Sequence, residues 1–176
     1  MPTNLDKVIA CLRDLNLRPN IHEYKWRFFT QKTAFLAKAL GMDISYSFTI
    51  YVSGPFSYEL NSDYYQYENK TKINSLQTDY VLTPLDISIL ERISACRDLY
   101  ENQNLMEATS TMVFLIGKYP QYNDEDIFRN IRLLKPHIRD TDRIIGLTRT
   151  KELLFKDEYI TDEIAREMGE WDRIDS

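Results

Sequence analysis

The residues that could perform chemistry in this chain are few and scattered. Acid–base catalysis needs titratable groups that converge on one site. The chain offers two histidines, His22 and His137, and the pair His22–Glu23 lacks the second histidine that a zinc-binding helix carries four residues on. The sequence contains no phosphate-binding glycine loop, no nucleophile elbow and no CxxC pair. We therefore expect a protein that is not an enzyme, with no catalytic residue and no cofactor.

Metal binding has equally little support in the sequence. Cys11 and Cys96 each lie within an apolar helical pattern without a histidine at ligand spacing, so we predict two reduced core residues. The acidic run at 123–126 has no glycine to fold a calcium loop, and acidic residues are favoured in the first turn of a helix. We expect no metal site.

Composition and charge predict a single helical domain. A chain of 176 residues is long enough to bury one substantial core, and its five glycines and six prolines are few for that length. The net charge of −5 removes the overall attraction that many nucleic-acid binders use. No apolar run is long enough to span a membrane, and no basic leader precedes one. We expect a cytoplasmic protein that does not enter a membrane.

The hydrophobic pattern then predicts the elements that must position any site. Helices are expected over about 5–15, 23–40, 55–67, 84–100, 105–117, 124–134 and 140–154, with a last one capped by Thr161 and bearing Ile164, Met168 and Trp171. Asn4 is the expected first cap, and the segment 68–79 is expected to be a loop. Ile127, Ile131 and Leu134 are expected on one buried face, and Ile144 and Ile145 on the next.

One segment changes period. Alternation of apolar and polar residues from Ile44 to Val52 predicts a half-buried strand. Its candidate partners are "INSL" at 73–76 and "DYVL" at 79–82, of which we prefer the second. Ser53 or Gly54 is then expected to serve as a helix cap, with Pro55 as the first helical residue. The predicted fold is mostly α, a helical bundle with a small antiparallel β element that is winged-helix-like. We expect residues 1–176 to form one domain, with residues 1–20 and the acidic helix 157–176 as appendages.

The aromatic residues around this strand are the first candidate site. Tyrosine combines a large apolar ring with a polar tip, which suits a contact surface that is partly exposed. The candidate partner-binding residues are Tyr51, Phe56, Tyr58 and Tyr65. Alternatives are a homodimer surface, or a core margin where the rings are buried and the hydroxyls stay wet. A third class, an enzyme with a pocket formed by Tyr51, Lys32 and Asp63, has less support.

A second candidate site is the basic helix pair near the C-terminus. Phosphate contacts would need several cations on one face. The candidate nucleic-acid-binding residues are Arg129, Arg132, Arg139 and Arg143. The simpler interpretation is an antiparallel helix pair with ordinary mixed charge on its solvent side.

The stretch "FFTQKTAFLAKALGMDISYSFTIYVSGPFSYELNSDYY", together with "NDEDIFRNIRLLKP", resembles the YwgA-like proteins over residues 24–155. It is also similar, more distantly, to the Panacea or SocA-like antitoxin domain, through Lys32, Leu36, Tyr51 and Gly54–Pro55. This resemblance implies a mostly helical fold with a small strand element, and a protein that acts by binding a partner such as a toxin. The expected function is a non-enzymatic protein-binding regulator, antitoxin-like or defence-associated, with a winged-helix-like DNA-binding regulator as the alternative.

Overall fold

A computed structural model describes residues 3–155 of the chain. The predicted last helix with Thr161, Ile164, Met168 and Trp171 lies outside the described residues, as does the acidic appendage at 157–176. Within the described part, the protein is mostly helical with one small antiparallel sheet, as the sequence predicts. The elements in chain order are α1 (Asn4–Asp14), α2 (Tyr24–Ala39), β1 (Thr49–Tyr51), β2 (Gly54–Phe56), α3 (Tyr58–Tyr65), α4 (Tyr67–Asn74), α5 (Pro84–Ala95), the 3₁₀ helix η1 (Arg97–Tyr100), α6 (Gln103–Lys118), α7 (Asp124–Leu134) and α8 (Asp140–Leu154).

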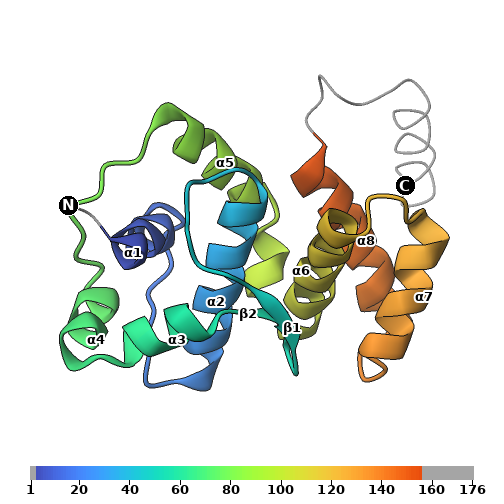
Figure 1. The fold of residues 1–176 in the computed structure, drawn as a ribbon, viewed down its shortest axis with the longest axis horizontal. Coiled ribbons are helices and arrows are strands. Elements are labelled where there is room, and N and C mark those ends of the chain that lie inside the picture. Colours follow the sequence, from blue (N-terminus) through green and yellow to red (C-terminus); the bar gives the residue numbers. More distant parts are fainter. Residues whose placement is uncertain (1–2, 156–176) are drawn as a thin grey trace.

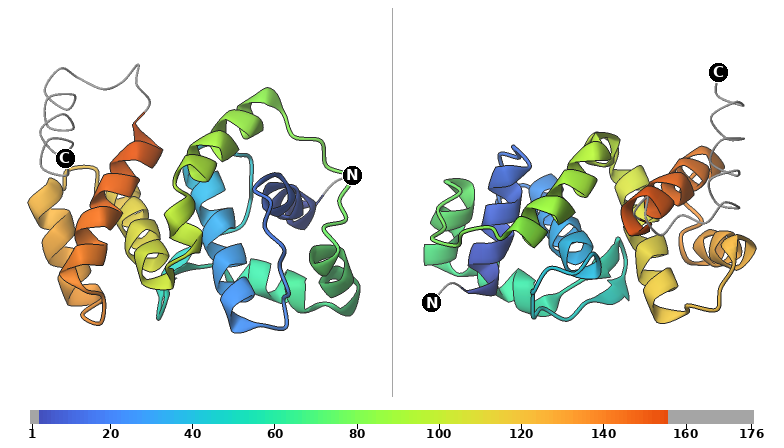
Figure 2. Two further views of the ribbon diagram at one scale, coloured as in Figure 1. Left: turned by 180° about the vertical axis from the view of Figure 1, so that it is seen from behind. Right: turned by 90° about the horizontal axis from the view of Figure 1, so that it is seen from above.

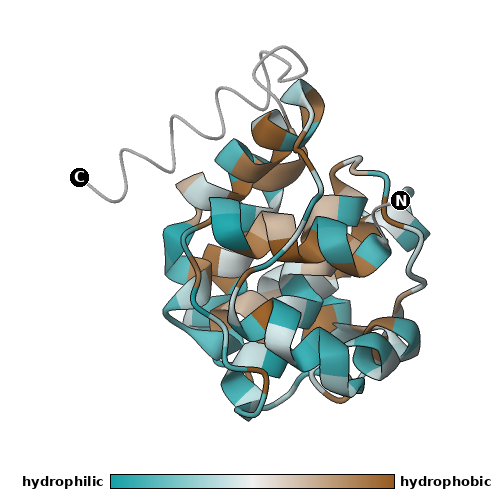
Figure 3. Cartoon of the chain, turned by 90° about the vertical axis from the view of Figure 1, so that its left-hand side faces the viewer, coloured by the Kyte–Doolittle hydropathy of each residue, from teal (hydrophilic) through white to brown (hydrophobic). Residues whose placement is uncertain are grey.

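Helix α2 lies at the centre of the molecule. Ten consecutive residues, 28–37, are buried, so neighbours cover this helix on all sides. Helices α1, α3, α4 and α5 lie on one side of it, and α6, α7 and α8 on the other (Figures 1 and 2). The larger apolar core surrounds α2, and a smaller one joins α6 to α7 and α8. Viewed from the α4 end, apolar segments gather between the helices (Figure 3).

Local sequence signals account for several helix ends. Within residues 3–155, three helices begin with a capping box. In this motif the side chain of the cap accepts from the backbone amide three residues on, and the side chain of that residue accepts from the backbone amide of the cap. The boxes pair Thr3 with Asp6, Thr83 with Asp86, and Asn123 with Asp126. The first cap is therefore Thr3 and not Asn4, because the threonine has the acidic partner that completes a box. Gly41, with a φ of 114°, follows the end of α2 as expected.

The strand prediction is wrong in its partner. Burial alternates as expected from Ile44 onward, but the ladder is confined to Thr49–Tyr51, which pairs with Gly54–Phe56 and not with residues 79–82. Gly54 has a φ of 95°, a conformation that glycine adopts without strain, so the chain reverses at once. Pro55 consequently lies in β2, and Ser57 caps α3 by accepting a hydrogen bond from the Leu60 amide.

The remaining differences concern α4, α5, α7 and α8. The helix predicted over 84–100 is divided into α5 and the 3₁₀ helix η1. Residues 67–74 form a helix where a loop is predicted. Leu134, Ile144 and Ile145 are exposed, not buried. Ile144 and Ile145 are exposed because α8 lies very close to α6: a Cβ at Gly146 would lie 3.3 Å from the Ala108 Cβ. Helix α8 therefore faces α6 with its glycine and not with its isoleucines.

Candidate functional site

The β1–β2 hairpin lies across α2 and α6, where these two helices meet (Figure 1). Its backbone approaches both helices closely at Gly54. A Cβ at this position would lie 3.0 Å from Thr111 Oγ1 and 3.6 Å from both Lys32 Cε and Glu107 Cγ. The absence of a side chain at Gly54 therefore permits this contact.

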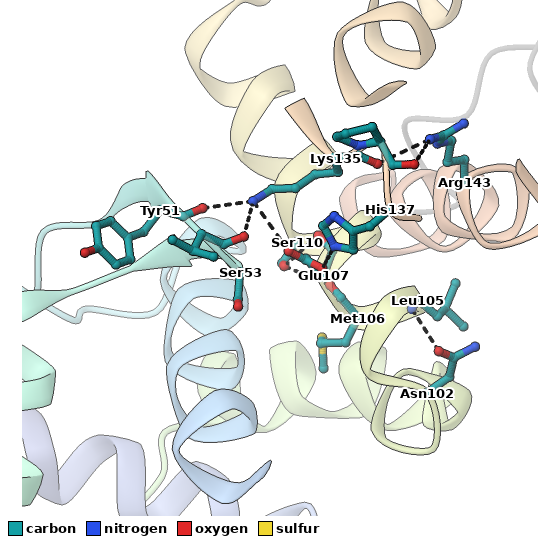
Figure 4. A network of polar contacts seen from close by, with 12 residues as sticks. Tyr51, Ser53, Asn102, Leu105, Met106, Glu107, Ser110, Lys135, His137 and Arg143 are labelled. Atoms are coloured by element: carbon teal, nitrogen blue, oxygen red, sulfur yellow. Dashed lines mark hydrogen bonds and ion pairs between the residues drawn. The ribbon is translucent and has the colours of Figure 1, made fainter. Parts of the chain in front are cut away.

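Two lysines hold the hairpin through its carbonyl oxygens. Lys32 Nζ, from α2, donates to the Pro55 oxygen at 2.8 Å. Lys135 Nζ, from the turn after α7, donates to the oxygens of Tyr51 at 2.9 Å and Val52 at 2.6 Å, as Figure 4 shows for Tyr51. The Lys135 bonds join segments more than 80 residues apart in the sequence, and the two lysines together fix the hairpin between the two sides of the molecule.

A buried carboxylate lies near both lysines. Glu107 Oε1 is 3.4 Å from Lys135 Nζ, and both side chains are buried. The other carboxylate oxygen, Oε2, is 2.8 Å from His137 Nε2, which comes from the same turn as Lys135 (Figure 4). Glu107 thus contacts both Lys135, which binds the hairpin turn, and His137 from the same segment.

Lys32 has an unusual environment for a lysine. Its side chain is buried, and within residues 3–155 it forms no ion pair at contact distance. Burial lowers the pKa of Lys32 from 10.5 to about 7, with the nearby Glu107 opposing this shift and Lys135 adding to it. Its amine therefore changes charge near neutral pH, directly behind the hairpin.

Between the hairpin, α2 and α3 lies a pocket of about 310 Å³. Its lining residues are Tyr24, Arg27, Phe28, Gln31, Lys32, Tyr51, Val52, Ser53, Gly54, Phe56, Asn61 and Tyr64. Several lining polar groups already bond one another: the Tyr24 hydroxyl lies 2.9 Å from Ser53 Oγ, and the Tyr64 hydroxyl donates to Asn61 Oδ1 at 2.7 Å. The pocket therefore presents mainly aromatic ring surface to a ligand.

The rim of this pocket is exposed and apolar. Relative exposure is 57% for Tyr24, 51% for Tyr51 and 75% for Val52. The rings of Tyr51, Phe56 and Tyr58 form a cluster beside it, with centroid separations of 5.2 to 5.9 Å. We call Tyr24, Tyr51, Val52, Phe56 and Tyr58 the aromatic rim.

Three of the four predicted partner-binding residues thus come together at this rim. The fourth, Tyr65, is exposed on α3 and packs its ring against Tyr64 at 5.3 Å between centroids. Of the three residues proposed for an enzyme pocket, Tyr51 and Lys32 line the hairpin pocket. Asp63 does not, since its carboxylate accepts the Tyr46 hydroxyl at 2.5 Å.

Sequence reasoning named Lys32 for the enzyme alternative, but it missed Phe28 from α2 and Glu107 from α6. Phe28 and Lys32 are four residues apart and share a buried helix face, so a lysine on an apolar stripe was the available signal. Glu107 had a similar signal, as an acid within the apolar pattern of α6. Their convergence on the hairpin depends on how the helices pack.

Three of the four predicted nucleic-acid-binding arginines form local ion pairs, and the fourth, Arg139, is exposed and directly precedes α8. Arg129 pairs with Asp126 one turn earlier in α7, and Arg132 and Arg143 both pair with Asp140. Arg143 is buried and also donates to the Lys135 carbonyl oxygen at 3.2 Å, which lowers its availability to a ligand. The hydrogen bond from Arg143 is the main cause that holds the Asp140 pKa below its usual value.

Other site types find no residues in the described part of the chain. No three His, Cys, Asp or Glu side chains among residues 3–155 are grouped to hold a metal ion. No helix in the same range is long and apolar enough to cross a membrane. Cys11 and Cys96 are buried free thiols, as predicted.

Comparisons with protein-family models, with curated proteins and with solved structures give no match. The resemblance to YwgA-like and Panacea-like proteins stays a prediction from the sequence, and the functional argument rests on the geometry of the pocket.

Proposed function

We propose that this protein is a non-enzymatic regulator that binds a partner protein by inserting one partner side chain into the hairpin pocket. The observation that carries the proposal is the aromatic pocket with an exposed apolar rim. Binding energy in protein interfaces is concentrated in a few aromatic anchors and the pockets that receive them. Here Tyr24, Tyr51 and Val52 leave a large apolar area in water beside such a pocket.

The lining predicts the chemistry of the anchor. Ring surface favours an aromatic or aliphatic side chain, because burying such a group against rings removes apolar area from water on both partners. Arg27 and Lys32 supply the charged lining groups, although the Arg27 guanidinium already donates to the Ile21 and His22 oxygens. A partner segment with an apolar anchor and an acidic neighbour fits this arrangement.

The class of partner follows from the sequence resemblance. Lys32 and Gly54–Pro55, the residues that carry the likeness to Panacea-like antitoxins, are also the residues that support the pocket wall. This coincidence supports an antitoxin-like or defence-associated regulator whose partner is a toxin or another regulatory protein.

A binding experiment with matched tyrosine variants tests the proposal. Wild type and a Tyr51→Ala/Tyr58→Ala variant would each be immobilised and exposed to lysate, and retained proteins would then be purified and titrated individually. We expect the double variant to bind the partner at least about tenfold more weakly, the loss of one interface hot spot. Tyr67→Ala is the control, since Tyr67 is 87% exposed on α4 and does not line the pocket.

Two outcomes would contradict the proposal. Equal affinity of the wild type and the double variant for every purified partner would show that the rim is not a contact surface. Loss of the partner with Tyr67→Ala to the same extent would place the interface elsewhere. Light scattering of the isolated protein identifies the homodimer alternative, since a dimer that is lost in the double variant would assign the rim to self-association.

A further inference from the structure

A second hollow lies beside β1 and is separate from the hairpin pocket. It is an open groove of about 760 Å³ between α2, β1, α6 and the end of α8. The hairpin pocket uses the first half of α2, up to Lys32, whereas the groove uses Phe35 and Ala39 from the second half. The two sites share no lining residue, so each can be tested without the other.

The groove is predominantly apolar and partly open to solvent. Its half-buried walls are formed by Phe48 and Ile50 beside the hairpin, Phe114 and Ile116 from α6, and Leu154 from α8. Leaving such residues in contact with water costs free energy that an apolar occupant would recover. The lining includes one charged residue, the exposed Lys118, and no carboxylate.

We propose that residues 156–176 of the same chain bind in this groove. The first argument is position. Leu154 is both the last residue of α8 and part of the groove wall, so the chain leaves α8 at the edge of the groove. Residue 156 follows two positions later, and a segment tethered this closely has an effective concentration on the order of millimolar for its own site.

The second argument is the sequence of residues 156–176. Ile160, Ile164, Met168 and Trp171 recur at intervals of four, four and three, the spacing that places side chains on one face of a helix. Such a face of four large apolar residues needs an apolar surface to cover it. The groove supplies that surface at the point where the described part of the chain ends.

The third argument is charge. Residues 156–176 contain eight acidic and three basic side chains, a net charge of −5. The whole chain also carries −5, so the acidic and basic side chains of residues 1–155 balance. Residues 156–176 are thus acidic, whereas residues 1–155 are neutral overall. The groove has a lysine at its rim and no acidic residue in its lining, so it attracts the acidic segment and does not repel it.

Trp171 provides a direct probe of this interaction. The chain has two tryptophans, so a full-length Trp26→Phe protein reports on Trp171 alone. We expect Trp171 in this parent to emit at shorter wavelength and to be protected from acrylamide, relative to the same protein in urea. An Ile50→Glu/Ile116→Glu change in the parent should remove both effects, because it places carboxylates on the groove wall opposite an acidic segment.

Two further variants separate binding from folding. Lys118→Glu reverses the exposed charge at the rim and should weaken the protection of Trp171 without disturbing the core. Ile145→Glu is the matched control, since Ile145 is 38% exposed on α8 and does not line the groove, and should leave Trp171 protected. Circular dichroism and urea unfolding would confirm that each variant is folded.

Several results would overturn the proposal. Trp171 could be as accessible in the folded parent as in urea, or it could be protected to the same degree in the groove variants and in the parent. Protection that disappears on dilution would show that the segment binds in the groove of a second copy and not in the groove of its own chain. None of these results depends on the hairpin pocket, so the proposed function would be unaffected.

Discussion

The ammonium of Lys135 lies 3.4 Å from the carboxylate of Glu107, and both side chains are buried. This pair links the turn after α7 to α6, and the same ammonium donates to two carbonyl oxygens of the hairpin. A buried ion pair contributes little to stability when compared with apolar residues, but removing one partner leaves an uncompensated charge. The pair therefore makes the position of the hairpin dependent on α6 and on the turn after α7 together.

Replacing Lys135 with methionine should destabilise the protein strongly. The change leaves Glu107 without its buried cation and two hairpin carbonyls without their donor, so we expect a loss of about 3–5 kcal/mol in the free energy of unfolding. Urea denaturation measures this loss. The Lys135→Met/Glu107→Gln double variant should recover part of it, because the buried charge is then gone. A single variant as stable as wild type would show that the pair is not buried in solution.

Gly54→Ala should also destabilise the protein, for a reason of geometry. An alanine at a φ of 95° is strained, at about 1–3 kcal/mol, and its Cβ would lie 3.0 Å from Thr111 Oγ1. Gly117→Ala is the control, since no heavy atom lies within 4 Å of its added Cβ and the residue is helical. We expect the midpoint temperature of thermal unfolding to fall for Gly54→Ala and to stay constant or rise for Gly117→Ala. Equal effects would contradict the hairpin geometry.

Lys32 should make stability depend on pH between about 7 and 9. The unfolded chain keeps its proton at Lys32 up to the ordinary pKa of 10.5, whereas the folded chain releases it near 7. The unfolded state therefore binds more protons in this range, and the free energy of unfolding rises with pH. Relative to Lys32→Met, wild type should gain about 2–3 kcal/mol between pH 6 and pH 9.

This gain is checked by urea denaturation of both proteins at several pH values. The comparison with Lys32→Met removes the contributions of other groups, such as Cys11. Burial raises the pKa of Cys11 from 9.0 to about 12, so its contribution to stability is full below pH 9 and is lost as the pH rises toward 12. Parallel pH profiles for the two proteins would show that the Lys32 amine stays charged in the folded state.

The DNA-binding alternative makes a distinct prediction. Because Arg129, Arg132 and Arg143 are paired with nearby carboxylates, we expect weak binding to duplex DNA, with little change in affinity between about 50 and 200 mM salt. Fluorescence anisotropy with a labelled duplex measures this. Tight binding that weakens steeply with salt and is lost in Arg129→Gln/Arg139→Gln would favour the helix pair as a nucleic-acid site.

Local signals in the sequence determined most of the helices. The capping boxes at Thr83 and Asn123 and the apolar pattern of α2 are short-range features, in which each residue interacts with neighbours three or four positions away. Such local interactions form in the same way whatever the tertiary structure around them. They also placed Tyr51, Phe56 and Tyr58 near one another, because the strand and the start of α3 are adjacent in the chain.

The partner of the strand, the inward face of α8 and the depth of the pocket were decided by the tertiary structure. The hairpin is held at this place because Lys32 and Lys135, which are far apart in sequence, both donate to its carbonyl oxygens. Gly54 lets its backbone pack closely against Thr111 and Glu107 of α6. The face of α8 is set by contact between Gly146 and α6, which no periodicity in α8 alone reveals. Spacing along the chain specifies which residues share a face, whereas close packing between elements selects the face that is buried.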